Sequence, residues 1–127
     1  MNRRMLLILV IALVLTGCGG KEMKNTYQQI SQEEAKNMMD TQEVIILDVR
    51  EQDEFDAGHI PGALLLPVGI ISEETAAAVI PDRNSVVLVY CRSGNRSKTA
   101  SGALAELGYT NIYEFGGIHT WPYEVEK

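Results

Sequence analysis

The hydrophobic residues of this chain are concentrated in short, nearly continuous runs. Two of these runs, VIILDV at residues 44–49 and SVVLVY at residues 85–90, are rich in β-branched residues. Continuous apolar runs of this length are typical of strands that are covered on both faces of a sheet. Together with shorter runs elsewhere, they predict strands at residues 27–30, 44–49, 63–67, 85–90 and 111–115.

Segments with helix-capping residues lie between the predicted strands. Ser31 is followed three residues later by Glu34, which is the capping-box pattern, and Ser72 is followed directly by two glutamates. An Ala-rich segment ends at Gly108, and glycine is common just after the end of a helix. These signals predict helices at residues 32–39, 51–58, 72–81 and 97–108, and a turn with a short helix after residue 116.

Strands and helices therefore alternate along the chain. This alternation predicts an α/β fold with a mostly parallel central sheet and helices on both of its faces. In such folds, ligands bind beyond the carboxyl ends of the strands. Cys91 directly follows the strand at 85–90, so we expect it at that edge of the sheet.

The N-terminal residues have the features of a secretory signal peptide. Two arginines precede ten apolar residues, fewer than the roughly 20 that a membrane-spanning helix needs. The LTGC sequence that follows resembles the bacterial lipobox, in which the cysteine becomes the lipidated first residue of the mature chain. We therefore expect a lipoprotein signal peptide at residues 1–17, a lipidated Cys18 with a tether at residues 18–26, and anchoring to a membrane outside the cytoplasm. A membrane anchor that is not removed is the alternative.

The charge of the remaining chain is strongly negative. Residues 18–127 contain all 17 Asp and Glu but only nine of the 11 Lys and Arg, which gives a net charge of −8. This charge argues against nucleic acid or anionic lipid as a general partner. A local cluster of positive charge is therefore informative. The length suits one domain, at residues 27–127.

Cys91 is the one thiol that remains if Cys18 is lipidated. An exported domain with a single free cysteine cannot form an internal disulfide, and such a thiol is a candidate reactive group. A buried structural cysteine is the alternative, because free cysteines are often buried.

The sequence around this thiol, CRSGNRS, favours the reactive interpretation. A helix starting near Ser97 would direct its N-terminal amides and the positive end of its dipole at the loop. Gly94 permits backbone torsions that let successive N–H groups converge on an anion, and Arg92 and Arg96 add positive charge. These features stabilise the thiolate, which is the nucleophilic form of cysteine. The loop is thus predicted to be an anion cradle with a nucleophile at its floor.

Cysteine phosphatases and sulfurtransferases both use such a cradle, and the length of the loop distinguishes them. Phosphatase loops have the spacing C-x5-R, whereas Cys91 and Arg96 have the spacing C-x4-R. The loop, the upstream sequence LDVREQDEFDAGHIPGA at residues 47–63 and the GG and W within residues 116–121 together resemble the rhodanese family. The resemblance covers residues 27–127 and implies a single rhodanese domain.

The resemblance implies a sulfurtransferase that acts through a persulfide on Cys91. The donor would be thiosulfate or a persulfide, the acceptor would be cyanide or a cellular thiol, and no metal or organic cofactor would be needed. The anion-binding loop would consist of Arg92, Ser93, Gly94, Asn95, Arg96 and Ser97, with Arg92 attracting the donor at the rim and Arg96 ordering the loop.

Other functions remain open. The domain could carry a persulfide for a partner protein without turning over on its own. A cysteine phosphatase or an arsenate reductase-like enzyme is a further alternative, against which the C-x4-R spacing argues.

Charged residues outside the loop are assigned structural roles. Asp48 and Arg50 are expected to form an ion pair at the end of a strand. His59 is expected to be structural, since a thiolate stabilised by amides needs no general base. A solvated helix face is expected for the acidic residues Glu51, Asp53, Glu54 and Asp56.

Overall fold

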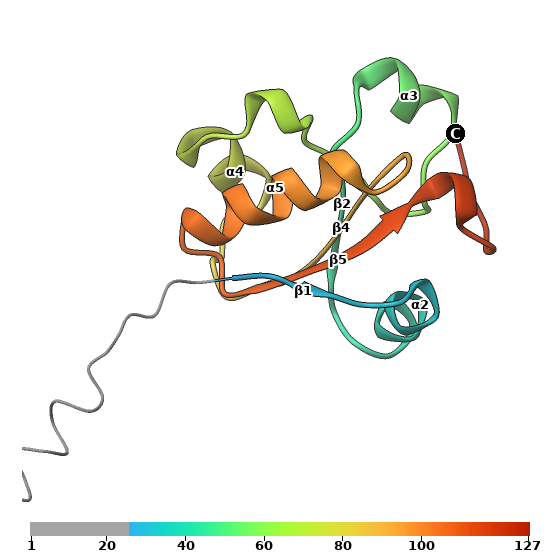
Figure 1. The fold of residues 1–127 in the computed structure, drawn as a ribbon, viewed down its shortest axis with the longest axis horizontal. Helices are drawn as coiled ribbons and strands as arrows, with labels where there is room; N and C mark the ends of the chain where they lie inside the picture. The colour runs from blue at the N-terminus through green and yellow to red at the C-terminus, as the bar shows by residue number, and fades with distance from the viewer. Residues whose placement is uncertain (1–25) are drawn as a thin grey trace, which may run out of the picture.

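The computed structural model describes residues 26–127, so the predicted signal peptide and Cys18 lie outside the described residues. The centre of the fold is a five-stranded sheet with the strand order β1-β5-β4-β2-β3, in which every neighbouring pair is parallel (Figure 1). The strands are β1 (Gln28–Gln29), β2 (Ile45–Asp48), β3 (Leu64–Leu65), β4 (Val86–Cys91) and β5 (Asn111–Gly117). The predicted α/β fold with a mostly parallel sheet is confirmed.

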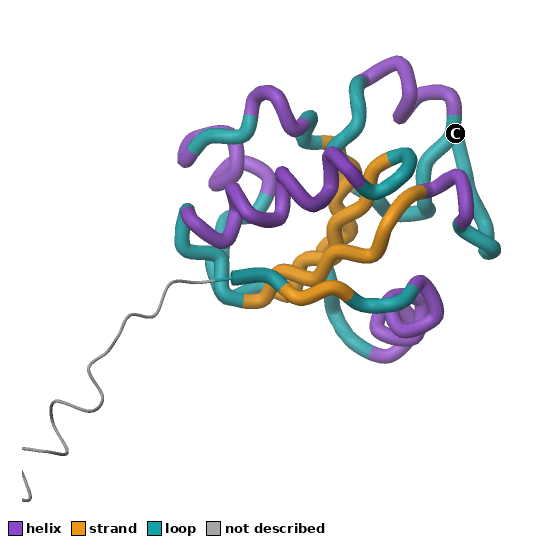
Figure 2. Tube along the Cα trace, in the orientation of Figure 1, coloured by secondary structure: helices purple, strands orange, loops and turns teal. Residues whose placement is uncertain are grey.

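Helices cover both faces of this sheet. The α-helices are α2 (Gln32–Thr41), α3 (Gln52–Ala57), α4 (Glu73–Val79) and α5 (Asn95–Glu106), and two 3-10 turns are η1 (Val68–Ile70) and η2 (Ile118–Thr120). Helix α2 lies on one side of the strands, whereas α4 and α5 lie on the other (Figures 1 and 2). Ser31 and Ser72 cap α2 and α4, as the sequence predicted, by accepting hydrogen bonds from backbone N–H groups three residues later.

The central strand β4 shows how the sequence fills both layers. Val87, Val89 and Cys91 point to the layer under α4 and α5, where they pack with residues such as Leu104. Leu88 and Tyr90 point to the opposite layer, with the α2 side of the core. Successive side chains of a strand point to opposite faces. A run with no polar alternation is therefore what a sheet buried on both faces requires.

Four elements differ clearly from the predictions. Helix α5 begins at Asn95 rather than near Ser97, because Gly94 adopts a left-handed backbone conformation (φ 109°) and starts the helix as its N-cap. The strands expected at residues 27–30 and 63–67 are reduced to two residues each, and both lie at the edges of the sheet. The short helix expected after residue 116 is the single 3-10 turn η2.

The segment after η2 returns to the body of the domain. Glu126 forms an isolated antiparallel bridge with His59, with two backbone hydrogen bonds of 2.8 Å. Within residues 26–127, no helix combines the length and the apolar character that a bilayer span would need.

Candidate active site

Cys91 is the last residue of β4 and lies at the carboxyl edge of the sheet, where the sequence placed it. The residue is 1% exposed and belongs to the core layer under α5. The pairing of β4 with β5 is irregular between Val89 and Cys91, and Cys91 is opposite Gly117. The thiol therefore lies at the junction between the sheet and the loop that leads into α5.

Gly94 brings a hydrogen-bond donor to the sulfur. Its backbone N–H donates to the Cys91 Sγ over 3.0 Å. The left-handed conformation of Gly94 is unfavourable for a residue with a β-carbon, which explains the glycine at this point of the loop. The chain turns back over the thiol within three residues and enters α5, so the first turn of the helix is close to the sulfur.

Ser97 in the first turn of α5 is the second polar neighbour of the thiol. Its side chain is fully buried, and its Oγ lies 3.4 Å from the Cys91 Sγ. Burial raises the pKa of Cys91, but hydrogen bonds to the sulfur from Ser97, Gly94 and Ser93 outweigh it, and the pKa lies below its ordinary value. A lowered pKa increases the fraction of the nucleophilic thiolate.

The C-terminal segment holds the other side of the loop. A β-carbon on Gly117 would overlap the carbonyl group of Arg92, so only glycine allows this close approach. Next to it, the backbone N–H and the ring Nδ1 of His119 lie 3.2 and 2.9 Å from the same Arg92 oxygen. His119 therefore binds the backbone of the loop.

Arg96 is held by an acidic residue of α3. Its guanidinium group donates two hydrogen bonds to the Glu54 carboxylate, at 2.8 and 2.9 Å. The expectation of a solvated helix face is therefore wrong for Glu54, because the loop folds back onto α3 and the side chain binds Arg96 there. The hydrogen bond from Arg96 is the main cause that lowers the pKa of Glu54 to about 2. This contact joins the loop to α3.

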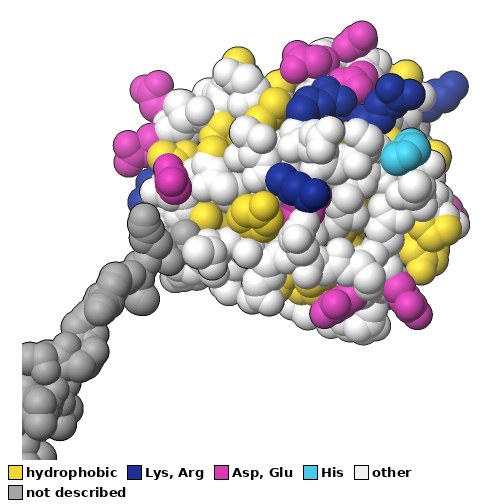
Figure 3. Space-filling view, viewed as in Figure 1, with side chains coloured by type: hydrophobic (Ala, Val, Ile, Leu, Met, Phe, Trp, Pro, Cys, Tyr) yellow, Lys and Arg dark blue, Asp and Glu magenta, His cyan; other side chains and the backbone are white. Residues whose placement is uncertain are grey.

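The remaining loop residues face solvent. Arg92, Ser93 and Asn95 are exposed, whereas Gly94 is buried. Lys and Arg side chains gather over the region where α3 and the beginning of α5 lie, although the whole chain is acidic (Figure 3). Exposed Arg92 is thus available to an anion that approaches the loop.

A buried ion pair fixes the segment upstream of the loop. Arg50 Nη2 lies 2.7 Å from Asp48 Oδ2, which confirms the predicted strand-end pair, and it also donates to the Gly58 carbonyl over 2.7 Å. The Tyr90 hydroxyl donates to the same Asp48 oxygen over 2.6 Å and accepts from the Ile60 N–H over 3.0 Å. Burial and the bond to Asp48 raise the pKa of Tyr90 above its ordinary value. This network ties the GHIPGA segment to the residue before Cys91.

His59 takes part in that segment's packing. Its ring stacks on Phe55 with a centroid distance of 3.8 Å, and its Nδ1 lies 2.9 Å from the Phe55 carbonyl oxygen. These contacts give it the structural role that we expected.

Sequence reasoning missed Glu114, which is 2% exposed and lies on β5 beside the site. Its Oε2 accepts a hydrogen bond from Ser97 Oγ over 2.5 Å. The one signal in the sequence is a charged residue inside a strand that helices cover on both faces. Only the register of β5 against β4, in which Glu114 is opposite Val89, shows that it faces α5.

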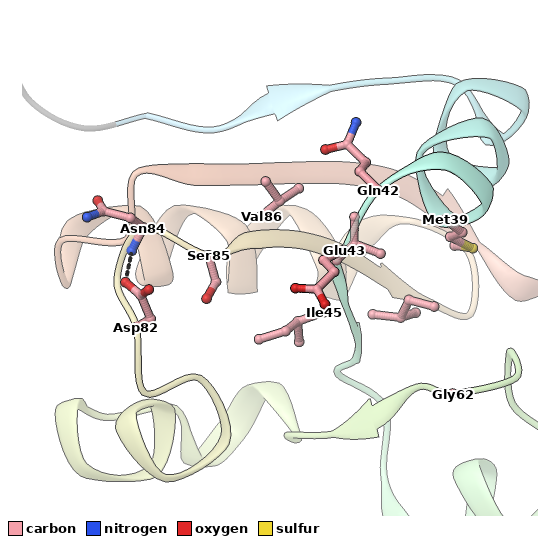
Figure 4. Close-up of a pocket in the computed structure, with 11 residues that line it drawn as sticks. Met39, Gln42, Glu43, Ile45, Gly62, Asp82, Asn84, Ser85 and Val86 are labelled. Carbon is pink, nitrogen blue, oxygen red and sulfur yellow. Dashed lines mark hydrogen bonds between the residues drawn. The ribbon is translucent and has the colours of Figure 1, made fainter.

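A hollow lies at the opposite edge of the sheet from this loop. It has a volume of about 770 Å³ and is lined at the amino ends of β2 and β4 by residues that include Glu43, Asp82 and Asn84 (Figure 4). None of the loop residues 91–97 lines it. The same part of the chain contains no group of three or more His, Cys, Asp or Glu side chains arranged to hold a metal ion.

Comparison with known proteins gives the family of this fold and loop. The family model described as the rhodanese-like domain matches residues 31–123 of this sequence. The chain belongs to the rhodanese-like family.

Two named relatives match most of this rhodanese domain. A thiosulfate sulfurtransferase, GlpE, of Coxiella burnetii (strain RSA 331) is 36% identical over 96 residues, which cover 75% of this chain and 87% of the relative. The thiosulfate sulfurtransferase PspE of Escherichia coli (strain K12) is 39% identical over 72 residues, covering 57% and 68% respectively. The chain is accordingly a rhodanese-type sulfurtransferase.

Solved structures agree with this assignment. A rhodanese with anions from E. coli superimposes with a TM-score of 0.62 at 32% identity, covering 67% of this chain and 99% of that structure. The rhodanese-like domain of the Anabaena sp. Alr3790 protein has a TM-score of 0.71 at 22% identity, over 80% of each chain. The fold class expected from the sequence is therefore confirmed.

The Arg96–Glu54 pair predicts an acid-dependent stability of the rhodanese domain. Because the folded state lowers the pKa of Glu54 from 4.5 to about 2, ionised Glu54 stabilises the fold above pH 4.5, and this contribution is lost as the pH falls towards 2. Glu54→Gln should lower the free energy of unfolding near neutral pH by up to about 1 kcal/mol, since the pair is partly exposed.

Urea unfolding of the wild type and the variant across this pH range measures the effect. Asp53→Asn, which removes an exposed charge on the same helix, is the matched control. The difference between Glu54→Gln and the wild type should shrink towards zero at the acid end. A difference that stays constant with pH would contradict the assigned ion pair.

Proposed function

We propose that the domain transfers a sulfane sulfur from thiosulfate or a persulfide donor to a thiophilic acceptor through a persulfide on Cys91. The observation that carries the proposal is the environment of the sulfur. Cys91 is 1% exposed, and its Sγ accepts a hydrogen bond from the Gly94 N–H at 3.0 Å and lies 3.4 Å from Ser97 Oγ. The relatives named thiosulfate sulfurtransferase support thiosulfate as the donor.

The two half-reactions use one nucleophile of the protein, Cys91, and together leave the protein without net oxidation. The Cys91 thiolate attacks the outer sulfur of thiosulfate, a new S–S bond forms, and sulfite leaves with the electron pair of the broken bond. Cyanide or a thiolate then attacks the outer sulfur of the persulfide. The S–S bond breaks, and its electron pair returns to Cys91 as the thiolate.

Each part of the loop has a role in this cycle. The hydrogen bonds to the sulfur stabilise the thiolate before attack and after transfer, because they favour the charged form. Exposed Arg92 attracts the anionic donor to the rim. Arg96 is already paired with Glu54, so it keeps the loop in shape.

The test follows the mass of the full chain. Wild type treated with thiosulfate and freed of excess reagent should gain one sulfur atom, and cyanide should remove it and release thiocyanate. Cys91→Ser, which retains Cys18, is the control and should gain nothing.

Repeated release of thiocyanate with excess reagents would support an enzyme. A single equivalent per chain would assign the sulfur-carrier role instead. If neither thiosulfate nor a persulfide donor adds sulfur to Cys91, the proposal fails, and hydrolysis of a phosphate ester or reduction of arsenate becomes the activity to assay.

We also propose that the domain is anchored outside the cytoplasm through a lipid on Cys18. Support comes from the basic N-terminus, the ten apolar residues and the LTGC sequence. A chain produced in a bacterial host should partition into detergent and begin at a diacylated Cys18 by mass spectrometry. Equal partitioning of the Cys18→Ser variant would contradict the anchor.

A further inference from the structure

Glu114 is a buried carboxylate for which the proposed sulfur transfer has not yet given a role. Its Oε2 accepts hydrogen bonds from Ser97 Oγ at 2.5 Å and from the Gly116 N–H at 2.9 Å, and its Oε1 accepts from Gln29 Nε2 at 3.2 Å. Within residues 26–127, no ion pair includes Glu114. A buried charge without a counter-ion is costly, so whether this carboxyl group carries a proton depends on the groups that it contacts.

Ser97 lies between Glu114 and the reactive sulfur and has only one proton to donate. Its Oγ is 2.5 Å from Glu114 Oε2 and 3.4 Å from Cys91 Sγ. If the Ser97 hydroxyl donates to an ionised Glu114, its oxygen can only accept from a neutral Cys91 thiol. If it donates to an anionic Cys91, the short contact with Glu114 requires a proton on the carboxyl group.

We propose that Glu114 holds the proton of Cys91 whenever the sulfur is an anion, and that Ser97 passes the proton between them. In the step that forms the thiolate, the Cys91 thiol gives its proton to Ser97 Oγ while the Ser97 hydroxyl gives its own proton to Glu114 Oε2. The thiolate and a neutral carboxyl group replace the thiol and a carboxylate, so the charge of the three groups stays at −1. No oxidant or other reactant is involved.

Constant charge is the physical advantage of this relay. Two negative charges separated only by the Ser97 oxygen would repel each other in a buried site, and groups that interact this strongly titrate as a pair. Glu114 is therefore a positioning residue that acts through Ser97. The inference rests on the proposed function insofar as the thiolate and the persulfide anion are the charged states that the relay serves.

Few other charged groups face this relay. Strand β1 presents the uncharged amide of Gln29, and α2 presents Gln32, whose amide binds the Phe115 and Gly117 carbonyls. Cys91 on β4 is the titratable partner, and the charge of Arg96 on α5 interacts with it. Arg96 is paired with Glu54 of α3, so Cys91 and Glu114 are the two ionisable groups that Ser97 joins.

The pH dependence of Cys91 alkylation by iodoacetamide tests the relay without any sulfur donor. Only the thiolate reacts, and peptide mass spectrometry of the full chain separates Cys91 from Cys18. The fraction of Cys91 that is thiolate sets the rate below the ordinary thiol pKa of about 8.5. In the relay Glu114 is neutral whenever Cys91 is anionic, so Glu114→Gln preserves the charge of the thiolate state and should leave the pH profile of the wild type unchanged.

The alternative role of Glu114 predicts a faster variant. If Glu114 stays ionised beside the thiolate, Glu114→Gln removes that repulsion and should react at least about tenfold faster below the ordinary thiol pKa, the effect of one pKa unit, and that result would overturn the proposal. Glu106→Gln, an exposed change on α5, is the matched control and should leave the profile unchanged. A sulfur-transfer assay that fails while this profile holds would refute the persulfide chemistry but leave the relay intact.

Infrared difference spectroscopy of the wild type keeps the test independent of whether Glu114→Gln folds. Alkylation of Cys91 near pH 6 replaces the thiolate with an uncharged thioether, so Glu114 should release its proton and the C=O band of a protonated carboxyl group should disappear. The Cys91→Ser variant should show no such change under the same treatment. An unchanged carboxyl band in the wild type would contradict the relay.

Discussion

The proposed chemistry depends on one requirement: a sulfur anion must be stable at a position that is almost completely removed from water. Burial alone disfavours the thiolate, and only donors aimed at the sulfur can reverse that effect. The backbone N–H groups of Gly94 and Ser97 are two such donors, and the pKa of Cys91 is lowered despite burial. They belong to a turn of three residues and the first turn of a helix, so small shifts of the loop would move both of them.

The rest of the domain holds that loop in place from three directions. Below it, β4 is buried on both faces, and its last residue cannot shift without disturbing two core layers. On one side, Gly117 allows β5 to approach the loop backbone closely. On the other, Glu54 of α3 binds Arg96 with two hydrogen bonds. Fixed dipoles of this kind stabilise charge without having to reorganise during the reaction.

Local patterns were sufficient to predict most of the fold and the position of the nucleophile. Uninterrupted apolar runs indicated buried parallel strands, and the polar loop after residues 85–90 located Cys91 at their carboxyl edge. Contacts between residues distant in sequence could not be predicted in this way. Glu54 lies 42 residues from Arg96, and Glu114 lies 17 residues from Ser97. Nothing in the sequence links either of these two acidic residues to its partner. The docking of α3 places Glu54 beside its partner, and the register of β5 does so for Glu114.

A crystal structure of the full chain treated with thiosulfate would test the central claim most directly. The account predicts density for one additional sulfur bonded to Cys91 Sγ, within hydrogen-bonding distance of backbone N–H groups of residues 92–97. The Arg96–Glu54 pair and the Ser97–Glu114 contact should be retained. An unmodified Cys91, or a bound sulfur or anion outside this loop, would contradict the account.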